Sequence, residues 1–428
     1  MNRDRRLLWI IVALALILRI AASWVWRDRL DEDIDGYRGI ATMVADGKGY
    51  SDPTHGTPTA FRPPLFPLLL AGVFKFAGGN TAIAAVQIGL GTLTVLLTGL
   101  IADRSNLRAA WLAPLIVALD PLQLAYTPRV MTEVASAFTM ALLLWTTARA
   151  QVQDWRLPAI SICGLAFGIA ALCRPTIWAL LPVVGVFVGL GVVRDRGRLF
   201  EVAKRAAVFG LCVAVVIAPW LVRNMSAIDA PVFTTTHGGY TLLLSNNPEF
   251  YSDIVPARWG TVWDSLPWQR RLKNDLIASG IGLQDERAKD RWMYARAFKN
   301  IQENPRGFVG SCWLKLRRFW NLAPQAEVQS PVVTWALRAF YLLVFAGLLL
   351  TVRHRGKKSQ VARVVLGLAW CMLLAFTAVH IFYWTNTRMR APLVAAIALL
   401  SARGWAGSRD ELSDKKLSDK NTAQESAE

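Results

Sequence analysis

Apolar runs close to twenty residues long recur along this chain of 428 residues, and a run of about twenty residues can cross a membrane as a helix. The composition agrees, because 54% of the residues are hydrophobic. Most of the Lys and Arg residues behind the net charge of +18 lie between these runs, which is typical of cytoplasmic loops rather than of a nucleic-acid-binding surface. The sequence therefore predicts an all-α polytopic membrane protein.

The orientation of the chain depends on its first apolar run and on one short run. Residues 7–26 follow a basic N-terminus, which indicates an uncleaved anchor with that terminus inside. The run between Arg62 and Lys75 would be about 17 Å long as a helix, whereas the hydrocarbon core is about 30 Å thick. We therefore expect it to lie along the outer surface. The arginines left on short outer turns are then Arg129, Arg174, Arg388 and Arg390.

The resulting topology has about ten spans with both termini inside. The spans cover residues 7–26, 80–102, 109–127, 132–148, 157–173, 176–193, 206–222, 331–352, 361–384 and 391–406. The chain then divides into four parts: a core at 1–222 that includes the first outer loop at 27–79, an outer domain at 223–330, C-terminal spans at 331–406, and a tail at 407–428. The tail is too polar to fold alone, so we expect it to be disordered in the cytoplasm.

The outer domain is predicted to be small and to mix helices with other structure. Residues 294–300 and 308–320 have the pattern of helices. Gly238-Gly239 and Asn246-Asn247-Pro248 indicate turns around a short apolar strand or loop. By its position this domain would cover a site on the outer face.

Negative charge is concentrated directly after the first span, where residues 31–35 read Asp-Glu-Asp-Ile-Asp. Residues at helical spacing come next, namely Tyr37, Ile40, Ala41 and Val44. They predict an amphipathic interfacial helix that stops at Gly47. One carboxylate can cap this helix, but a single cap does not need four of them. The others are either solvated charges or candidates for a general base that takes a proton from a hydroxyl or amine.

Arginine on the same side of the membrane suits an anion. Arg62 precedes two prolines, which bias it to an extended conformation and stiffen the backbone after it. A guanidinium held in this way fits a pair of phosphate oxygens, and contact with lipid headgroups is the alternative. Other charged side chains map to the outer ends of spans: Arg129, Glu133, Arg174, Arg223, His380, Arg388 and Arg390. Charges at such depth are often functional or paired, so their gathering on one face points to a site.

Six motifs occur in a fixed order along the chain. They are YRGIATMVADGKGYSDPTHGTPTAFRPPLFPLLLAGVF, PRVMTE, ALCRPT, PWLVRN, GGYTLLLSNNPEFY and TRMRAPL. In this order they resemble bacterial membrane glycosyltransferases of the family 39 type. These enzymes are relatives of protein O-mannosyltransferases and of the lipid A aminoarabinose transferase, and they have the C-type glycosyltransferase fold. The resemblance runs from about residue 5 to residue 405.

The resemblance implies roles for particular residues. The family has a catalytic Asp four residues before an aromatic residue, and Asp33 stands in that position before Tyr37. The family often has an Asp-Glu pair where this chain has Asp33-Ile34 followed by Asp35, so the choice between Asp33 and Asp35 stays open. A Lys or Arg before Pro-Pro holds the donor phosphate in relatives, which matches Arg62. Further candidates for phosphate binding are Arg223, Arg388 and Arg390. Residues expected to line the donor or acceptor site are Tyr37, Arg129, Glu133, Arg174, Asn246 and His380.

The function implied by the resemblance is transfer of a hexose or pentose from a polyprenyl-phosphate donor. The reaction would be a single inverting displacement at the periplasmic face of a bacterial inner membrane, with a lipid, glycan or protein acceptor of the cell envelope. Arginines can stabilise the leaving phosphate without a cofactor, and a divalent cation at the acidic cluster is the alternative. The five cysteines have neither a disulfide nor a metal-binding spacing. A lipid-linked sugar flippase or another transporter is the alternative function, although the internal repeats expected of a transporter are not evident.

Overall fold

The computed structural model of this protein describes residues 3–190, 199–324, 330–353 and 359–407. Within these ranges the regular structure is entirely helical, and the one β-type contact is an isolated bridge between Ser51 and Pro58. The prediction of an all-α chain is therefore confirmed. Apart from Gly407, the tail that was predicted to be disordered lies outside the described residues.

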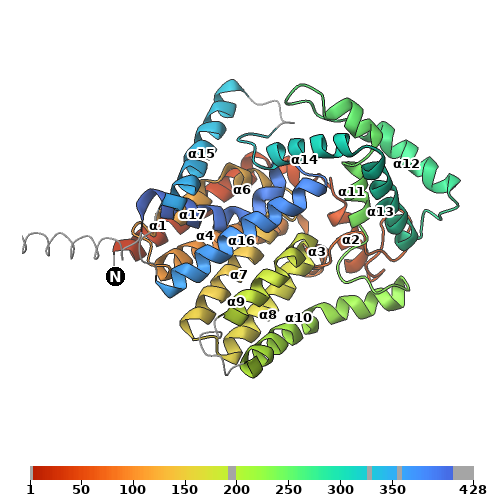
Figure 1. Ribbon diagram of the computed structural model, residues 1–428. Helices are drawn as coiled ribbons and strands as arrows, with labels where there is room; N and C mark the ends of the chain where they lie inside the picture. The colour runs from red at the N-terminus through yellow and green to blue at the C-terminus, as the bar shows by residue number, and fades with distance from the viewer. Residues whose placement is uncertain (1–2, 191–198, 325–329, 354–358, 408–428) are drawn as a thin grey trace, which may run out of the picture.

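The first half of the chain supplies most of the helical bundle and the first outer loop. Its helices are α1 (Arg3–Val25), α2 (Tyr37–Ala45), α3 (Leu65–Phe76), α4 (Gly79–Arg104), α5 (Leu112–Leu119), α6 (Pro121–Tyr126), α7 (Glu133–Val152), α8 (Leu157–Cys173), α9 (Leu181–Leu190) and α10 (Leu199–Ala227), with the short 3-10 helices η1 (Arg27–Leu30) and η2 (Pro175–Leu180). Helix α7 packs between α4 and α8, and α10 packs along α8 (Figure 1).

The second half adds an outer group of helices and returns to the bundle. Its helices are α11 (Gly238–Leu244), α12 (Leu266–Ala278), α13 (Glu286–Glu303), α14 (Pro305–Phe319), α15 (Pro331–Leu350), α16 (Gln360–Phe382) and α17 (Val394–Ala406), with the short elements η3 (Phe250–Ile254), η4 (Thr351–Arg353) and η5 (Thr387–Leu393). Helices α11 to α14 gather at one end of the bundle, near α2 and α3 (Figure 1).

Five helices in the described ranges are long and apolar enough to cross a membrane, so this is a multipass membrane protein. They lie within α1, α4, α10, α15 to η4, and α16. Shorter apolar helices occupy Leu65–Phe76, Leu157–Cys173 and Pro175–Val186. Most of the ten predicted spans coincide with a helix or with two consecutive short ones, but the count of ten stays a prediction. The short run at Leu65–Phe76 forms a single helix, α3, which packs on α2.

One predicted span is broken near its middle. Residues 109–127 form two short helices that meet at Asp120, whose side chain accepts a hydrogen bond from the backbone N–H of Gln123 at 2.9 Å. Pro121 then occupies the first position of α6, where a missing N–H costs nothing. The break turns the chain toward the start of α7, where the candidate site begins.

Helix α2 comes after the acidic residues, as the sequence predicts. Tyr37, Ile40 and Ala41 form its buried face, and Gly47 behind it has a φ of 77°, the left-handed conformation that favours glycine after a helix. The amphipathic helix is therefore confirmed, while its place at the membrane interface stays a prediction. Tyr37 and Ala41 pack with Phe66 and Leu70 of α3, and Ile40 packs with Trp220 of α10, so the loop is fixed to both helices.

The predicted short strand or loop around Leu242 is wrong, because residues 238–244 form helix α11. The two glycines there allow a close approach rather than a turn. A Cβ at Gly238 would overlap the ring of Tyr294, and a Cβ at Gly239 would overlap the backbone carbonyl of Asp290. Helix α11 can therefore lie directly against α13, and the regular structure in the described part of the outer domain is helical, with loops between the helices.

Gly404→Ala is expected to destabilise the bundle by about 1 to 3 kcal/mol. Helices α15 and α17 meet at Gly347 and Gly404, where a Cβ on Gly404 would overlap the Gly347 carbonyl oxygen. The helices would have to move apart. Gly210→Ala in α10 is the matched control, because no atom lies within 4 Å of a Cβ built there. Equal thermal unfolding midpoints for the two variants in detergent would contradict the proposed contact.

Candidate active site

The carboxylates of the first outer loop are used in different ways. Each oxygen of Asp33 accepts a backbone N–H from the first turn of α2, from Arg38 at 3.0 Å and from Gly39 at 2.8 Å. Asp31 accepts a hydrogen bond from the side chain of Asn80 at 2.7 Å. Gly36 is at the N-cap position of α2, and the side chain of Asp33 supplies the acceptors for the first turn that the sequence anticipated from one carboxylate, while Asp35 points elsewhere.

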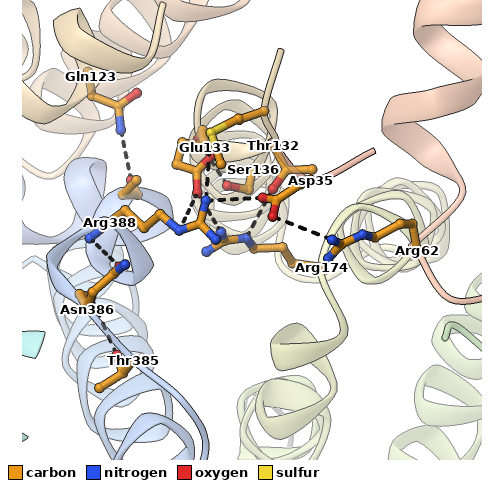
Figure 2. Close-up of polar contacts among 12 residues, drawn as sticks. Asp35, Arg62, Gln123, Thr132, Glu133, Ser136, Arg174, Thr385, Asn386 and Arg388 are labelled. Atoms are coloured by element: carbon orange, nitrogen blue, oxygen red, sulfur yellow. Dashed lines mark hydrogen bonds and ion pairs between the residues drawn. The ribbon is translucent and has the colours of Figure 1, made fainter. Parts of the chain in front are cut away.

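Asp35 lies between two arginines that are far apart in the sequence (Figure 2). Its carboxylate oxygens are 3.1 Å from Nη1 of Arg388 and 3.5 Å from Nη2 of Arg62. Burial opposes the charged form of this carboxyl, but the Arg388 and Arg62 guanidiniums outweigh burial and hold the pKa of Asp35 below its usual value. Asp35 therefore remains ionised and joins the first outer loop to η5.

A second carboxylate completes the cluster at the start of α7. Oε1 of Glu133 lies 2.9 Å from Nη2 of Arg174 and 3.9 Å from Nε of Arg388, so Arg388 is shared between Glu133 and Asp35 (Figure 2). The side chain of Glu133 is 1% exposed. Nη1 of Arg174 and Oε2 of Glu133 are buried and make no hydrogen bond within the described part of the chain. Three arginines face two carboxylates, which leaves one positive charge and open donors for an anion.

Arg62 is held in place by aromatic rings and by its own backbone. Its guanidinium lies over the rings of Tyr37, at 5.4 Å, and Phe61, at 5.2 Å. The hydroxyl of Tyr50 donates to the backbone carbonyl of Arg62 at 3.0 Å. Such a guanidinium has little freedom left to lose when it binds an anion.

His237 stands on the other side of Arg62 and was not anticipated from the sequence. Its Nε2 is 3.4 Å from Nη1 of Arg62, and its ring packs on Phe61 and Tyr240. Burial and the neighbouring Arg62 charge lower the pKa of His237 well below its usual value, so the ring is neutral at pH 7. The sequence did carry a signal for this residue: the chain has only four histidines, and His237 directly precedes the GGYTLLL motif.

Two predicted phosphate-binding arginines do not join the cluster. Arg223 donates to the backbone carbonyl of Thr59 at 2.7 Å and to that of Tyr50, so it supports the segment that leads to Arg62. Arg390 donates to the backbone carbonyls of Phe319 and Asn321 at 3.0 and 2.9 Å. Both guanidiniums thus satisfy backbone acceptors, which a sequence motif cannot indicate.

The other predicted lining residues divide in the same way. Tyr37 lies beneath Arg62, and the backbone carbonyl of Arg129 accepts from Gln87 at 2.6 Å, close to the start of α7. His380 is buried against Phe319 and bonds the carbonyl of its own helix. Asn246 donates to the carbonyls of Leu242 and Phe382 and joins α11 to the end of α16. The cluster therefore consists of Asp35, Arg62, Glu133, Arg174 and Arg388.

The described residues include no group of three His, Cys, Asp or Glu side chains arranged to hold a metal ion. The acidic stretch illustrates why. Asp31 is bonded to Asn80, Asp33 to backbone amides and Asp35 to guanidiniums, so the carboxylates do not converge on one point. A divalent cation at the acidic cluster stays the alternative prediction.

Glu133→Gln is expected to lower the free energy of unfolding by about 3 kcal/mol. The substitution removes the negative charge beside Arg174 and Arg388, so the mostly buried Arg174 loses its carboxylate partner and Arg388 keeps Asp35 alone. Glu201→Gln, which breaks an exposed pair with Lys204, is the control and should change little. Chemical denaturation in micelles measures both, and equal midpoints would contradict a structural role for the Glu133 pair.

Comparison with protein families gives one match. Residues 61–222 match the family described as dolichyl-phosphate-mannose-protein mannosyltransferase. The matched stretch contains Arg62, Glu133 and Arg174, while Asp35 and Arg388 lie outside it. No curated protein sequence matches the chain.

Comparison with solved structures gives matches over almost the whole chain. The archaeal oligosaccharyltransferase AglB from Archaeoglobus fulgidus, in complex with an inhibitory peptide and a dolichol-phosphate, has a TM-score of 0.55 at 18% identity; the match covers 94% of this chain and 50% of that one. The same organism's oligosaccharyltransferase tethered to an acceptor peptide gives 0.54 at 16% identity, with 94% and 49% covered. ArnT from Cupriavidus metallidurans bound to undecaprenyl phosphate gives 0.42 at 16% identity, with 93% and 77% covered. This chain thus spans about half the length of the oligosaccharyltransferase it matches.

Proposed function

We propose that this chain, which has the C-type glycosyltransferase fold and resembles the protein mannosyltransferase family, transfers a sugar from a polyprenyl-phosphate donor to an acceptor at the outer face of the membrane. One observation carries the proposal: Arg62 and Arg388 converge on the buried carboxylate of Asp35. Two guanidiniums that meet at one anion provide the charge and the paired donors that a phosphate requires.

The donor phosphate would bind where Asp35 now meets the arginines. Arg62 and Arg388 would turn from the carboxylate to the phosphate oxygens, and Arg174 would add the donor that has no partner among the described side chains. The surplus positive charge of the cluster favours this exchange, because a phosphate satisfies more N–H groups than one carboxylate does. In this proposal Asp35 positions the arginines and is displaced by the donor.

Asp33 is the better candidate for the general base. Each oxygen of Asp33 accepts one backbone N–H bond and keeps a further lone pair that can take a proton, whereas the carboxylate of Asp35 is held by two guanidiniums that keep its pKa low. A carboxylate with a lowered pKa is a weaker base. The position of Asp33, four residues before Tyr37, also matches the catalytic position of the family that the chain resembles.

The proposed reaction is a single displacement with inversion at the anomeric carbon. The oxygen or nitrogen of the acceptor attacks that carbon while its proton passes to Asp33. The bond from the anomeric carbon to the phosphate oxygen breaks, and its electron pair leaves with the polyprenyl phosphate. Arg62 and Arg388 stabilise the charge that grows on that oxygen, so the site needs no other electrophile.

The orientation supports a site on the outer face. Arg62 and Asp35 belong to the loop at 27–79 that is predicted to be outside, because the basic loops after it are predicted to be inside. For a bacterial chain this outer face is the periplasmic side of the inner membrane. Donor and acceptor would then meet outside the cytoplasm.

The proposal is tested with the full chain reconstituted in lipid. Wild-type protein is offered a panel of polyprenyl-phosphate sugars that carry a radiolabel in the sugar, with membrane extract as acceptor. The proposal predicts that label moves from one donor to an acceptor. If the labelled donor instead crosses the bilayer intact, the protein is a transporter and the proposed transfer is wrong.

A further inference from the structure

We propose that a cavity of about 300 Å³ between the first outer loop and helices α12 and α13 binds the acceptor, and that it selects a polypeptide segment with a bulky apolar residue beside an acidic one. The inference rests on the proposed transfer reaction and names the acceptor class. The cavity lies in the helical outer domain, and its size is at the lower end of the range for ligand pockets.

The cavity shares a wall with the cationic cluster. Phe61 lines the cavity, and the guanidinium of Arg62 lies over the same ring. Tyr240 also lines it and stacks on His237, which contacts Arg62. One layer of side chains therefore separates the cavity from the arginines that are proposed to bind the donor phosphate. A ligand in the cavity therefore lies beside the proposed donor site, on the other side of Phe61 and Tyr240.

The floor of the cavity is apolar. Leu272 and Leu276 of α12 and Met293 of α13 are buried there, and Leu283 completes the floor. Aliphatic side chains give no hydrogen-bonding partner to the hydroxyls of a sugar, so a neutral glycan would lose hydration without compensation. An apolar group gains free energy on the same floor. The volume fits a side chain, whereas an acyl or polyprenyl chain would extend far beyond it.

The rim of the cavity carries cations without carboxylate partners. Within the described residues, neither Lys273 nor Lys289 is in an ion pair; Lys289 donates to the backbone carbonyl of Leu283 at 2.6 Å. The carboxylate that lines the wall, Glu286, accepts hydrogen bonds from the side chains of Thr59 and Thr236 and from the backbone N–H of Ala60. Glu286 is thus committed to the fold, and the two lysines are available to an acidic ligand.

Glu286 also links the cavity to the donor site. It holds Thr59 and Ala60, which directly precede Phe61 and Arg62 in the chain. A ligand that packs against this wall would steady the segment that presents Arg62. Glu286 would in this way couple ligand binding in the cavity to the position of Arg62. It would do so without touching the reacting atoms of either substrate.

The experiment measures peptide binding without any donor. The full chain in neutral phosphatidylcholine nanodiscs is titrated against fluorescent Gly-Ser peptides whose centre is Leu-Glu, Leu-Lys or Gly-Glu, and anisotropy is read. We expect the Leu-Glu peptide to bind about tenfold more tightly than either of the other two. Leu-Lys lacks the charge-assisted contact and Gly-Glu lacks the apolar contact, and losing either contact weakens binding by about tenfold. Lys273→Glu should abolish the preference for Glu over Lys. Arg270→Glu, an exposed change on the same helix and outside the cavity, should keep it.

Three results would overturn the inference: equal binding of the three peptides, an unchanged preference in Lys273→Glu, or displacement of the peptide by nanodiscs with anionic lipid, which would make the cavity a lipid site. The measurement is independent of transfer. Peptide binding without any sugar transfer would leave the cavity assignment standing and reject the proposed function, whereas transfer without peptide selectivity would do the reverse.

Discussion

Asp33→Asn is expected to lower kcat by about 10² to 10⁴ with little change in the KM for the donor, because it removes the proposed general base and leaves the arginines untouched. Asn keeps one of the two side-chain acceptors that Asp33 offers to the first turn of α2, so the fold should survive. Steady-state transfer assays over a range of donor concentrations separate the two parameters. Unchanged secondary structure by circular dichroism is the control for folding.

Asp35→Asn is the matched comparison, since it removes a carboxylate two residues away. If Asp35 holds Arg62 and Arg388 until the donor arrives, its loss removes a competitor of the phosphate. The KM for the donor should then fall, and kcat should fall much less than in Asp33→Asn. A larger loss of kcat in Asp35→Asn than in Asp33→Asn would move the base to Asp35 and reject the roles assigned to the two carboxylates.

Arg62→Ala is expected to lower kcat/KM by about 10² to 10³, the usual cost of removing one group that stabilises charge in a transition state. Arg62→Lys keeps the charge but loses the paired donors and the contact with the rings of Tyr37 and Phe61, so it should restore only part of the activity. Arg270→Ala on α12 is the control for loss of a surface charge. Wild-type activity in Arg62→Ala would contradict a phosphate site at this residue.

Much of the fold was predictable because membrane spans leave a local signal. Hydropathy located most of the long helices without any knowledge of packing, while the orientation that the loop charges indicate stays a prediction. Helix α2 was predictable for the same reason, since Tyr37, Ile40 and Ala41 repeat at helical spacing. The prediction of a strand or loop around Leu242 failed because a glycine pair can have two structural roles. Glycine pairs are typical of turns, but Gly238 and Gly239 instead allow helix α11 to touch α13.

The candidate site was only partly predictable because its contacts join distant segments. The sequence indicated that Arg62 and Arg388 lie on the outer side, but their meeting at Asp35 depends on how η5 packs beside the first outer loop. Arg223 has the same residue type and location as Arg62, and yet it bonds backbone carbonyls. A motif cannot distinguish these uses. Glu286 was not anticipated at all, because a single Glu in a polar helix has no distinctive pattern.

The most direct test of the proposed transfer is the balance of its products in one reaction. For the full chain in lipid, we expect each labelled sugar gained by the acceptor to be matched by one released polyprenyl phosphate, and both products to be lost together in Arg62→Ala and Asp33→Asn. The proposed reaction would be contradicted if the donor stays intact, or if both variants transfer sugar at the wild-type rate.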